Sequence, residues 1–245
     1  MPETILVTGA SSDLGGALIR NLLVKDPTAT VMAHSHTGSV RIQELGNEFG
    51  DRIQPITADL SDSSQVASMG DDILARFGCP SQFVHLPGVR LRYERVSKFD
   101  LAHFHRDMAI QVDSAFLLLK QFAPKMSKLA AARVVFVLSS VTRGLPPKFM
   151  SMYSVVKYAQ LGLMRAAAAE FASTPLTING VSPGMIETQF LEEIGDVAVR
   201  MSAAANPRAR NAAPSDVIGA IEFLLSPAAA YITGAEIPVT GGSSA

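Results

Sequence analysis

The chain has 245 residues, 48% of them hydrophobic and 18% charged, which provides enough apolar material for a folded core. Its 21 basic and 22 acidic residues give a formal net charge of −1, which disfavours a nucleic-acid binder with a broad basic surface. The single cysteine, Cys79, excludes an intrachain disulfide and a multi-cysteine metal site, so we expect no metal. The apolar runs are too short to span a bilayer, and the N-terminus resembles no secretory signal. We therefore expect a cytoplasmic protein with neither a membrane nor a nucleic-acid partner.

Short apolar runs alternate with longer amphipathic stretches along the whole chain. The runs predict strands at Ile5–Thr8, Thr30–Ala33, Ile53–Thr57, Phe83–Leu86, Val134–Leu138, Thr177–Val181 and Glu236–Val239. Helical patterns occupy residues 13–25, 39–49, 62–77, 100–128, 152–173 and 215–226. This order predicts one α/β domain over residues 1–245, a Rossmann-like doubly wound parallel sheet of about seven strands with helices on both faces. Such sheets bind ligands beyond the carboxyl ends of their strands.

The first predicted strand runs into a glycine-rich turn, T-G-A-S-S-D-L-G-G, which is followed by an apolar helix. Such a turn lets backbone N–H groups approach a pyrophosphate at a helix N-terminus, although a plain tight turn would need the same glycines. The expected contacts are Gly9, Ser11, Ser12, Asp13, Leu14 and Gly15. A carboxylate beside a diphosphate is unfavourable, so Asp13 could instead cap the helix with its side chain turned away. On the electrostatic argument, Asp13→Gly should tighten cofactor binding.

The end of the second predicted strand bears on the choice of nicotinamide cofactor. NAD-selective sites usually place an Asp or Glu there to accept hydrogen bonds from the ribose 2′-hydroxyl, and this chain has His34-Ser35-His36-Thr37 instead. These residues leave room for a 2′-phosphate, with Arg41 as a candidate partner, and predict that NADP(H) is preferred over NAD(H). Alternatively, the two histidines are ordinary loop residues.

The fifth predicted strand ends at Ser139-Ser140, and Tyr153 and Lys157 follow on the next helix. Their i, i+4 spacing puts the tyrosine and the lysine on one helix face, where Ser140 can meet them. An ammonium within roughly 4–6 Å lowers a tyrosine pKa by about 1–3 units, so Tyr153 could exchange a proton with a carbonyl or alcohol oxygen. Ser140 would hydrogen-bond that oxygen while a nicotinamide exchanges a hydride with its carbon. Because Y-x-x-x-K alone occurs on many surface helices, its combination with the serine and the turn carries the argument.

Together these motifs resemble the short-chain dehydrogenase/reductase family over the whole chain, and most of all its 3-oxoacyl-[acyl-carrier-protein] reductase branch. The stretch N-G-V-S-P-G-M-I-E-T, residues 179–188, is similar to the family segment that holds the nicotinamide end. The resemblance implies that Tyr153 and Lys157 also hold the cofactor. It adds to the cofactor site Asp59, Leu60, Leu86, Pro87, Gly88, Pro183, Gly184, Ile186 and Thr188. Asp59 would contact the adenine, or it is only a turn residue before the next helix.

Three positions depart from the family pattern. Asp13 replaces the central glycine of the turn, His85-Leu86-Pro87-Gly88 replaces N-N-A-G, and Gln111 replaces the asparagine of the catalytic tetrad. In relatives that asparagine holds a water that links the lysine to solvent. Gln111 carries the same amide, which predicts reduced but real activity, unless it is only a helix residue.

The resemblance implies an NADPH-dependent reductase of a ketone, a β-ketoacyl thioester linked to carrier protein or CoA, in fatty acid or polyketide biosynthesis. The expected catalytic residues are Tyr153 as the acid, Lys157, Ser140 and Gln111. One alternative is an NAD(P)-dependent dehydrogenase of a small secondary alcohol. The other is a catalytically silent nucleotide-binding or scaffold subunit, which the three departures motivate.

Two further segments bear on substrate and partners. Four basic residues after the fourth strand would attract an acyl carrier protein or form a solvated loop: Arg90, Arg92, Arg95 and Lys98. The segment 187–210 is expected to fold over the substrate, with an inner face or core formed by Phe190, Leu191, Ile194, Val197, Val199 and Met201. By resemblance, the chain forms a homotetramer or homodimer through the helices at 100–128 and 152–173, where the small residues 166–169 allow close approach.

Overall fold

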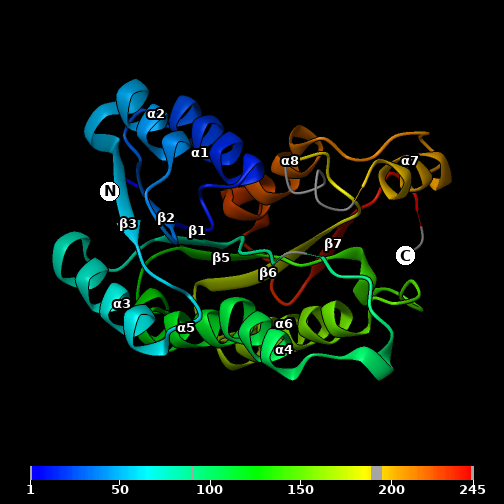
Figure 1. Cartoon of the computed structure of the whole chain (residues 1–245). Coiled ribbons are helices and arrows are strands. Elements are labelled where there is room, and N and C mark those ends of the chain that lie inside the picture. Colours follow the sequence, from blue (N-terminus) through cyan, green and yellow to red (C-terminus); the bar gives the residue numbers. More distant parts are fainter. Residues whose placement is uncertain (1, 90, 189–194, 244–245) are drawn as a thin grey trace.

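The computed structural model describes residues 2–89, 91–188 and 195–243, which form a seven-stranded parallel sheet between two helical layers (Figure 1). The strands are β1 (Thr4–Thr8), β2 (Thr30–Ser35), β3 (Ile53–Thr57), β4 (Gln82–His85), β5 (Ala132–Val137), β6 (Leu176–Pro183) and β7 (Glu236–Val239). Their order across the sheet is β3-β2-β1-β4-β5-β6-β7. The predicted Rossmann-like fold is confirmed, and every predicted strand is present. The sequence order reverses between β1 and β4, which is where such sheets bind ligands.

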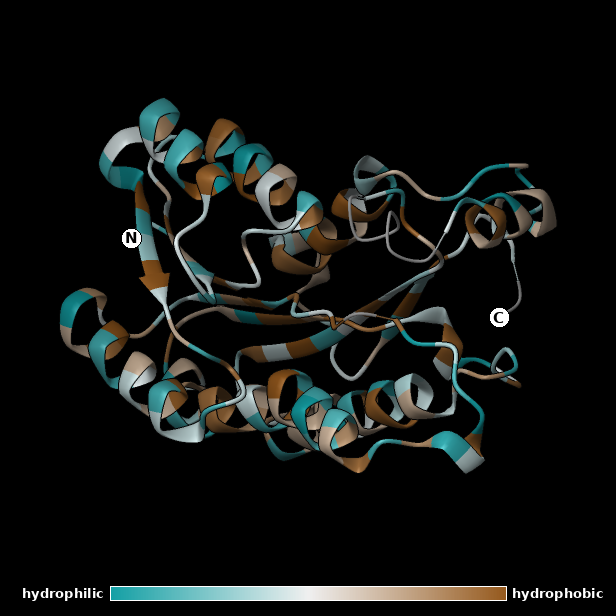
Figure 2. Ribbon diagram, viewed as in Figure 1, coloured by the Kyte–Doolittle hydropathy of each residue, from teal (hydrophilic) through white to brown (hydrophobic). Residues whose placement is uncertain are grey.

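Helices cover both faces of the sheet (Figure 1). On one face lie α1 (Asp13–Lys25), α2 (Val40–Phe49) and α8 (Pro214–Leu225), and on the other α3 (Ser63–Phe77), α4 (Leu101–Met108), α5 (Ser114–Met126) and α6 (Ser151–Glu170). Successive residues of a strand point to opposite faces, so Val134 and Phe136 enter one core while Val135 enters the other. Most strand residues are therefore apolar, and brown segments are frequent along the central strands in Figure 2. None of the helices in the described ranges is long and apolar enough to cross a membrane.

The single helix predicted at 100–128 is wrong, because the structure divides it. A π-helical turn, Ala109–Asp113, joins α4 to α5. A π turn inserts a residue without breaking the run of amphipathic sequence, so hydrophobic periodicity does not reveal it. It also takes carbonyl groups away from their normal i, i+4 helical partners, and Gln111 lies in this turn. A further helix, α7 (Asp196–Ala205), lies within the predicted substrate segment and was not predicted as a helix.

Candidate active site

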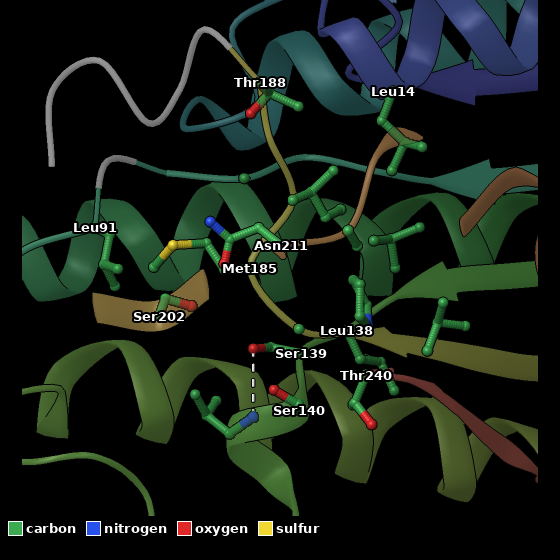
Figure 3. A pocket seen from close by; sticks show the side chains of 18 of the residues that line it. Leu14, Leu91, Leu138, Ser139, Ser140, Met185, Thr188, Ser202, Asn211 and Thr240 are labelled. Atoms are coloured by element: carbon green, nitrogen blue, oxygen red, sulfur yellow. Dashed lines mark hydrogen bonds between the residues drawn. The ribbon is translucent and has the colours of Figure 1, made fainter. Parts of the chain in front are cut away.

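A pocket of about 1170 Å³ opens at the carboxyl ends of the central strands (Figure 3). The glycine-rich turn forms one end of its lining, and α6, α7 and the residues after β7 form the remainder. The predicted site residues that line it are Ser11, Ser12, Asp13, Leu14, Leu86, Gly88, Ser140, Tyr153, Lys157, Pro183, Gly184, Ile186 and Thr188. The predicted residues that lie outside the lining are Gly9, Gly15, His34, Ser35, His36, Asp59, Leu60, Pro87 and Gln111.

The glycines of the turn are required by its backbone and by its close packing. Gly9 has φ +74°, and a Cβ there would lie 3.1 Å from the nitrogen of Pro87, at the end of β4. A Cβ on Gly15 would lie 2.8 Å from the Cα of Ala10. The turn therefore packs directly against the neighbouring strand end, and α1 starts immediately above it, as a phosphate-binding turn requires.

Ser12, rather than Asp13, caps α1, so that expectation is wrong. The Ser12 hydroxyl oxygen accepts a hydrogen bond from the backbone N–H of Gly15 at 3.0 Å, and Asp13 is the first residue of the helix. The carboxylate of Asp13 instead accepts a hydrogen bond from the guanidinium of Arg41, on α2. Arg41 also donates to the carbonyl of Ser11. The charge of Asp13 is thus balanced at the turn, and Arg41 ties α2 to that turn.

His34 supports the turn from within the fold. Its ring is 2% exposed, its Nδ1 accepts from the N–H of Gly9 at 3.3 Å, and its Nε2 donates to the carbonyl of Ala58 at 3.0 Å. Burial lowers the pKa of His34, which keeps the ring neutral as this pairing needs. The imidazole therefore acts on the conformation of the turn instead of lining the pocket.

The other polar residues after β2 and β3 form local contacts. Ser35 donates its hydroxyl to the carbonyl of Thr37 at 2.6 Å. Asp59 accepts from the hydroxyl and the N–H of Ser61, and these hydrogen bonds lower the pKa of its carboxyl. His36 lies with Nδ1 3.6 Å from an Asp59 oxygen. Asp62, not Asp59, caps α3, so Asp59 forms a turn that precedes the helix.

Lys157 lines the pocket although it is almost entirely buried, with 3% of its surface exposed. Its ammonium donates to the carbonyl of Val137 at 3.2 Å and to the side-chain oxygen of Gln160 at 3.0 Å. The Nζ atom lies 5.9 Å from the centre of the Tyr153 ring. Burial lowers the pKa of Lys157 to about 7, because the charged form loses its hydration. The lysine therefore titrates in the neutral range.

Tyr153 does not show the lowered pKa that its spacing from Lys157 predicts. Burial raises the pKa of its hydroxyl, and a side-chain hydrogen bond to Ser139 offsets this only in part. Desolvation of the phenolate is the largest cause, and the nearby Tyr93 raises the pKa further. The proton therefore stays on Tyr153 through neutral pH.

Two adjacent serines, Ser139 and Ser140, line the pocket together with the tyrosine, and Ser140 was the one predicted. Ser139 is buried, and its hydroxyl oxygen accepts from the N–H of Val141 at 3.4 Å (Figure 3). Ser139 is also the hydrogen-bond partner of Tyr153. Ser140, the predicted catalytic serine, lines the same pocket one residue further on. The Ser-Ser pair at the strand end was the signal for Ser139.

Gln111 enters the site through its backbone instead of its side chain. Its carbonyl, in the π-helical turn, accepts from Nε2 of Gln160 at 3.2 Å and from Nε2 of His85 at 3.1 Å. Both polar atoms of its own amide are buried without a hydrogen-bond partner in the described part of the chain. His85 completes the group through Nδ1, which accepts from the hydroxyl of Thr8 at 2.9 Å. Burial lowers the pKa of His85 to about 3, so the ring is neutral.

The substrate side of the pocket differs from the expected apolar face. Helix α7 turns Ala198 and Ser202 toward the pocket, whereas Val197 and Met201 are 63% and 68% exposed. These are two i, i+4 pairs on different sides of one helix, so the expectation for Val197 and Met201 is wrong. Of the other expected apolar residues, Val199 is half-buried, and Phe190, Leu191 and Ile194 lie outside the described residues.

The predicted basic cluster is partly neutralised. Hydrogen bonds from the backbone N–H groups of Ala102 and His103 lower the pKa of the Asp100 carboxyl, and the charge of Arg92 adds to this effect. Burial raises the pKa of Asp107, and the charge of Arg92 opposes that rise. The guanidinium of Arg95 lies 5.8 Å from the centre of the Phe149 ring, and Lys98 is exposed. Arg90 lies outside the described residues. Within the described ranges of the chain, no group of three or more His, Cys, Asp or Glu side chains could hold a metal ion.

Comparison with known proteins identifies the family. A family model described as enoyl-(acyl carrier protein) reductase matches residues 9–244. The chain belongs to this family of short-chain dehydrogenases/reductases, and the class it defines is an NAD(P)-dependent oxidoreductase.

Three curated relatives show the range of activities among proteins similar to this chain. A cis-4-hydroxycyclohexanecarboxylate dehydrogenase of Sinomonas cyclohexanicum is 31% identical, over 98% of this chain and 96% of the relative. An acetoacetyl-CoA reductase of Allochromatium vinosum is 29% identical, over 99% and 98%. A 3-oxoacyl-[acyl-carrier-protein] reductase of Vibrio cholerae is 28% identical, over 98% and 96%. Among solved structures, ElxO with NADP bound superposes with a TM-score of 0.88 at 24% identity, covering 99% of this chain and 98% of that one.

Proposed function

We propose that the protein is an NADPH-dependent reductase that converts a β-ketoacyl thioester to the hydroxyacyl thioester. The observation that carries this proposal is the position of Tyr153, Lys157 and the two serines on the wall of a pocket whose other end is the glycine-rich turn. A dinucleotide that lies along this pocket can have its phosphates at the turn and its nicotinamide beside the tyrosine.

The residues of the pocket fit a dinucleotide. The Gly9 turn admits no Cβ, the N-terminus of α1 opens on the pocket, and the end of β6 supplies Pro183, Gly184 and Ile186. The preference for NADPH is supported by the absence of a carboxylate at the end of β2, residues 34–37, and by Arg41 in the pocket lining. A relative of the same fold was solved with NADP bound.

The chain's own residues supply a proton donor, the groups that hold the substrate oxygen beside it, and a cation that stabilises the ionised donor. When bound, the nicotinamide supplies the hydride that reduces the carbonyl carbon. The Tyr153 hydroxyl donates a proton to the carbonyl oxygen, and its raised pKa keeps that proton available through neutral pH. The hydroxyls of Ser139 and Ser140 hold the oxygen against the tyrosine, and the ammonium of Lys157 stabilises the phenolate that remains. Because burial lowers the pKa of Lys157 to about 7, the ammonium is lost, and turnover declines, as pH rises above that value.

A β-ketoacyl thioester is supported as the substrate by relatives and by the pocket lining. Two of the curated relatives reduce acetoacetyl-CoA or 3-oxoacyl carrier protein, according to their names. Leu91, Met150 and Met185 provide an apolar wall in the pocket near the serines. A carrier protein would approach over the exposed residues Arg95 and Lys98.

A second copy of the chain is proposed as a partner, in a homodimer or homotetramer. The observation that supports it is an exposed set of large apolar side chains on α5 and α6: Phe116 at 55%, Val155 at 51% and Tyr158 at 43%. Small residues at Ala166 and Ala169 are also exposed on α6. Light scattering of the purified chain measures this directly, and a monomeric mass would contradict it.

Oxidation of a secondary alcohol is the second candidate, because the dehydrogenase from Sinomonas is 31% identical to this chain. The same residues serve both directions, but oxidation needs Tyr153 to start as the phenolate that accepts a proton. The raised pKa of its hydroxyl keeps it in the protonated form that reduction uses. A silent scaffold subunit is the third candidate. The presence of Tyr153, Lys157 and both serines in one pocket opposes it.

One assay separates the three candidates. Purified enzyme is given NADPH with acetoacetyl-CoA, NADH with the same ketone, and NADP⁺ or NAD⁺ with 4-hydroxycyclohexanecarboxylate, and the reduced nicotinamide is followed by absorbance. We expect NADPH and the thioester to give the highest kcat/KM. Faster oxidation of the alcohol would support the dehydrogenase, and no turnover on a broad panel would support the silent subunit.

A further inference from the structure

Gln160 lies directly behind Lys157, three residues further along α6. Its side-chain oxygen accepts from the lysine Nζ at 3.0 Å, and its Nε2 donates to the Gln111 carbonyl at 3.2 Å. Gln160 has no exposed surface, and Lys157 is 3% exposed. A single amide therefore bridges the buried ammonium to the π-helical turn.

The orientation of this amide is fixed by the chemistry of its two partners. An ammonium is only a donor, so it must meet the amide oxygen, and a backbone carbonyl is only an acceptor, so it must meet the amide N–H₂. Nε2 of His85 donates a second hydrogen bond to the same carbonyl oxygen, at 3.1 Å. The carbonyl that accepts both bonds lies within the π-helical turn, Ala109–Asp113. Reversing the amide would put two donors against each other and two acceptors against each other.

We propose that Gln160 is a positioning residue for the reaction, which holds the ammonium of Lys157 in place and closes its inner side to water. This inference rests on the proposed reductase function, because it assigns Gln160 a task in that same site. Lys157 has three N–H donors, and Val137 and Gln160 take two of them, which leaves one for partners on the pocket side. An amide neither gains nor loses a proton near neutral pH, so the bridge holds the lysine without carrying protons past it.

The charged and titratable groups that face Lys157 are few. Tyr153 faces Lys157 from the same helix, α6. His85, at the end of β4, interacts with Lys157 electrostatically. The backbone carbonyl of Val137, in β5, accepts directly from Lys157. The backbone carbonyl of Gln111, in the π-helical turn, is linked to Lys157 through the Gln160 amide. A carboxylate in place of the Gln160 amide would therefore be the dominant new charge beside the ammonium. An opposite charge within about 4–6 Å raises a lysine pKa by about 1–3 units.

The test is an NMR titration of lysine side chains labelled with ¹³C at Cε, which needs no turnover. The Lys157 signal is assigned by its absence in Lys157→Arg. We expect Gln160→Glu to raise the titration midpoint of Lys157 by at least about 1 pH unit, and the near-isosteric Gln160→Leu to lower it by roughly 1 unit through loss of an acceptor. Gln43→Glu, which adds the same charge at an exposed position of α2, is the matched control and should leave the midpoint unchanged.

The outcomes separate this inference from the proposed function. If both Gln160 variants leave the Lys157 midpoint where it is in the wild type, or if Gln43→Glu moves it equally, the positioning role is refuted. In kinetics, the fall of kcat/KM at high pH should move with the Lys157 midpoint, upward in Gln160→Glu and downward in Gln160→Leu. A wild type that turns over no ketone would refute the reductase, while the titration would still decide the role of Gln160.

Discussion

The buried imidazole of His85 makes the stability of this fold sensitive to acid. The ring is fully buried between Phe83 and Phe136, and it is neutral because burial lowers its pKa from 6.5 to about 3. A group whose pKa is depressed by folding contributes stability that is complete above its unfolded pKa and is lost as pH falls toward its folded pKa. For His85 the window therefore runs from pH 6.5 down to about 3.

The size of the effect follows from the two pKa values. Between pH 7 and pH 5 the unfolded chain takes up a proton at this position while the folded chain does not, which costs about 2 kcal/mol of unfolding free energy. His85→Asn removes the titration. The variant should therefore lose about 2 kcal/mol less than the wild type over this interval, whatever its stability at pH 7.

Urea unfolding at pH 5, 6 and 7 measures this difference. His105→Asn, at an exposed position on α4, is the matched control and should follow the wild type. The reasoning is refuted if wild type and His85→Asn lose stability in parallel, because His85 would then titrate in the folded protein as it does in the unfolded chain.

Three further predictions concern the turn and the serines. Asp13→Gly should tighten NADPH binding several-fold in a fluorescence titration, because it removes a carboxylate near the phosphates and releases one of the two hydrogen bonds of Arg41. Weaker binding would show that the Asp13–Arg41 pair is needed to shape the site. Gly9→Ala should lower the unfolding free energy by about 1–3 kcal/mol in chemical denaturation, since φ is +74° and the new Cβ meets the next strand end, and an unchanged value would contradict this packing. Ser139→Ala should change the pH dependence of kcat, because Ser139 bonds Tyr153, whereas Ser140→Ala should lower kcat without moving it; equal profiles would contradict the distinction.

Much of the fold could be predicted because it depends on local pattern. Parallel strands buried on both faces are mostly apolar, and each of the seven runs is bounded by turn residues. The π-helical turn and α7 could not be predicted in this way. The first leaves the amphipathic pattern uninterrupted, and the second shows its apolar residues to solvent while its small residues face the pocket.

The sequence predicted which residues form the site better than it predicted the contacts between them. Motif spacing indicated Tyr153 and Lys157, but the direction of the Tyr153 pKa depends on burial, which spacing does not give. The partnership of Asp13 with Arg41 joins residues 28 apart in sequence through the packing of α1 on α2. Gln160 had a signal that was missed, since a glutamine three residues after Lys157 lies on the same helix face.

The central claim is that Tyr153 donates the proton in an NADPH-dependent reduction. The most direct test measures NADPH oxidation with acetoacetyl-CoA by the wild type and by Tyr153→Phe, with NADPH binding followed separately by fluorescence. We predict that the variant loses at least about 100-fold in kcat and binds NADPH as the wild type does. Turnover by Tyr153→Phe at a rate close to the wild type, with the same cofactor affinity, would contradict the account.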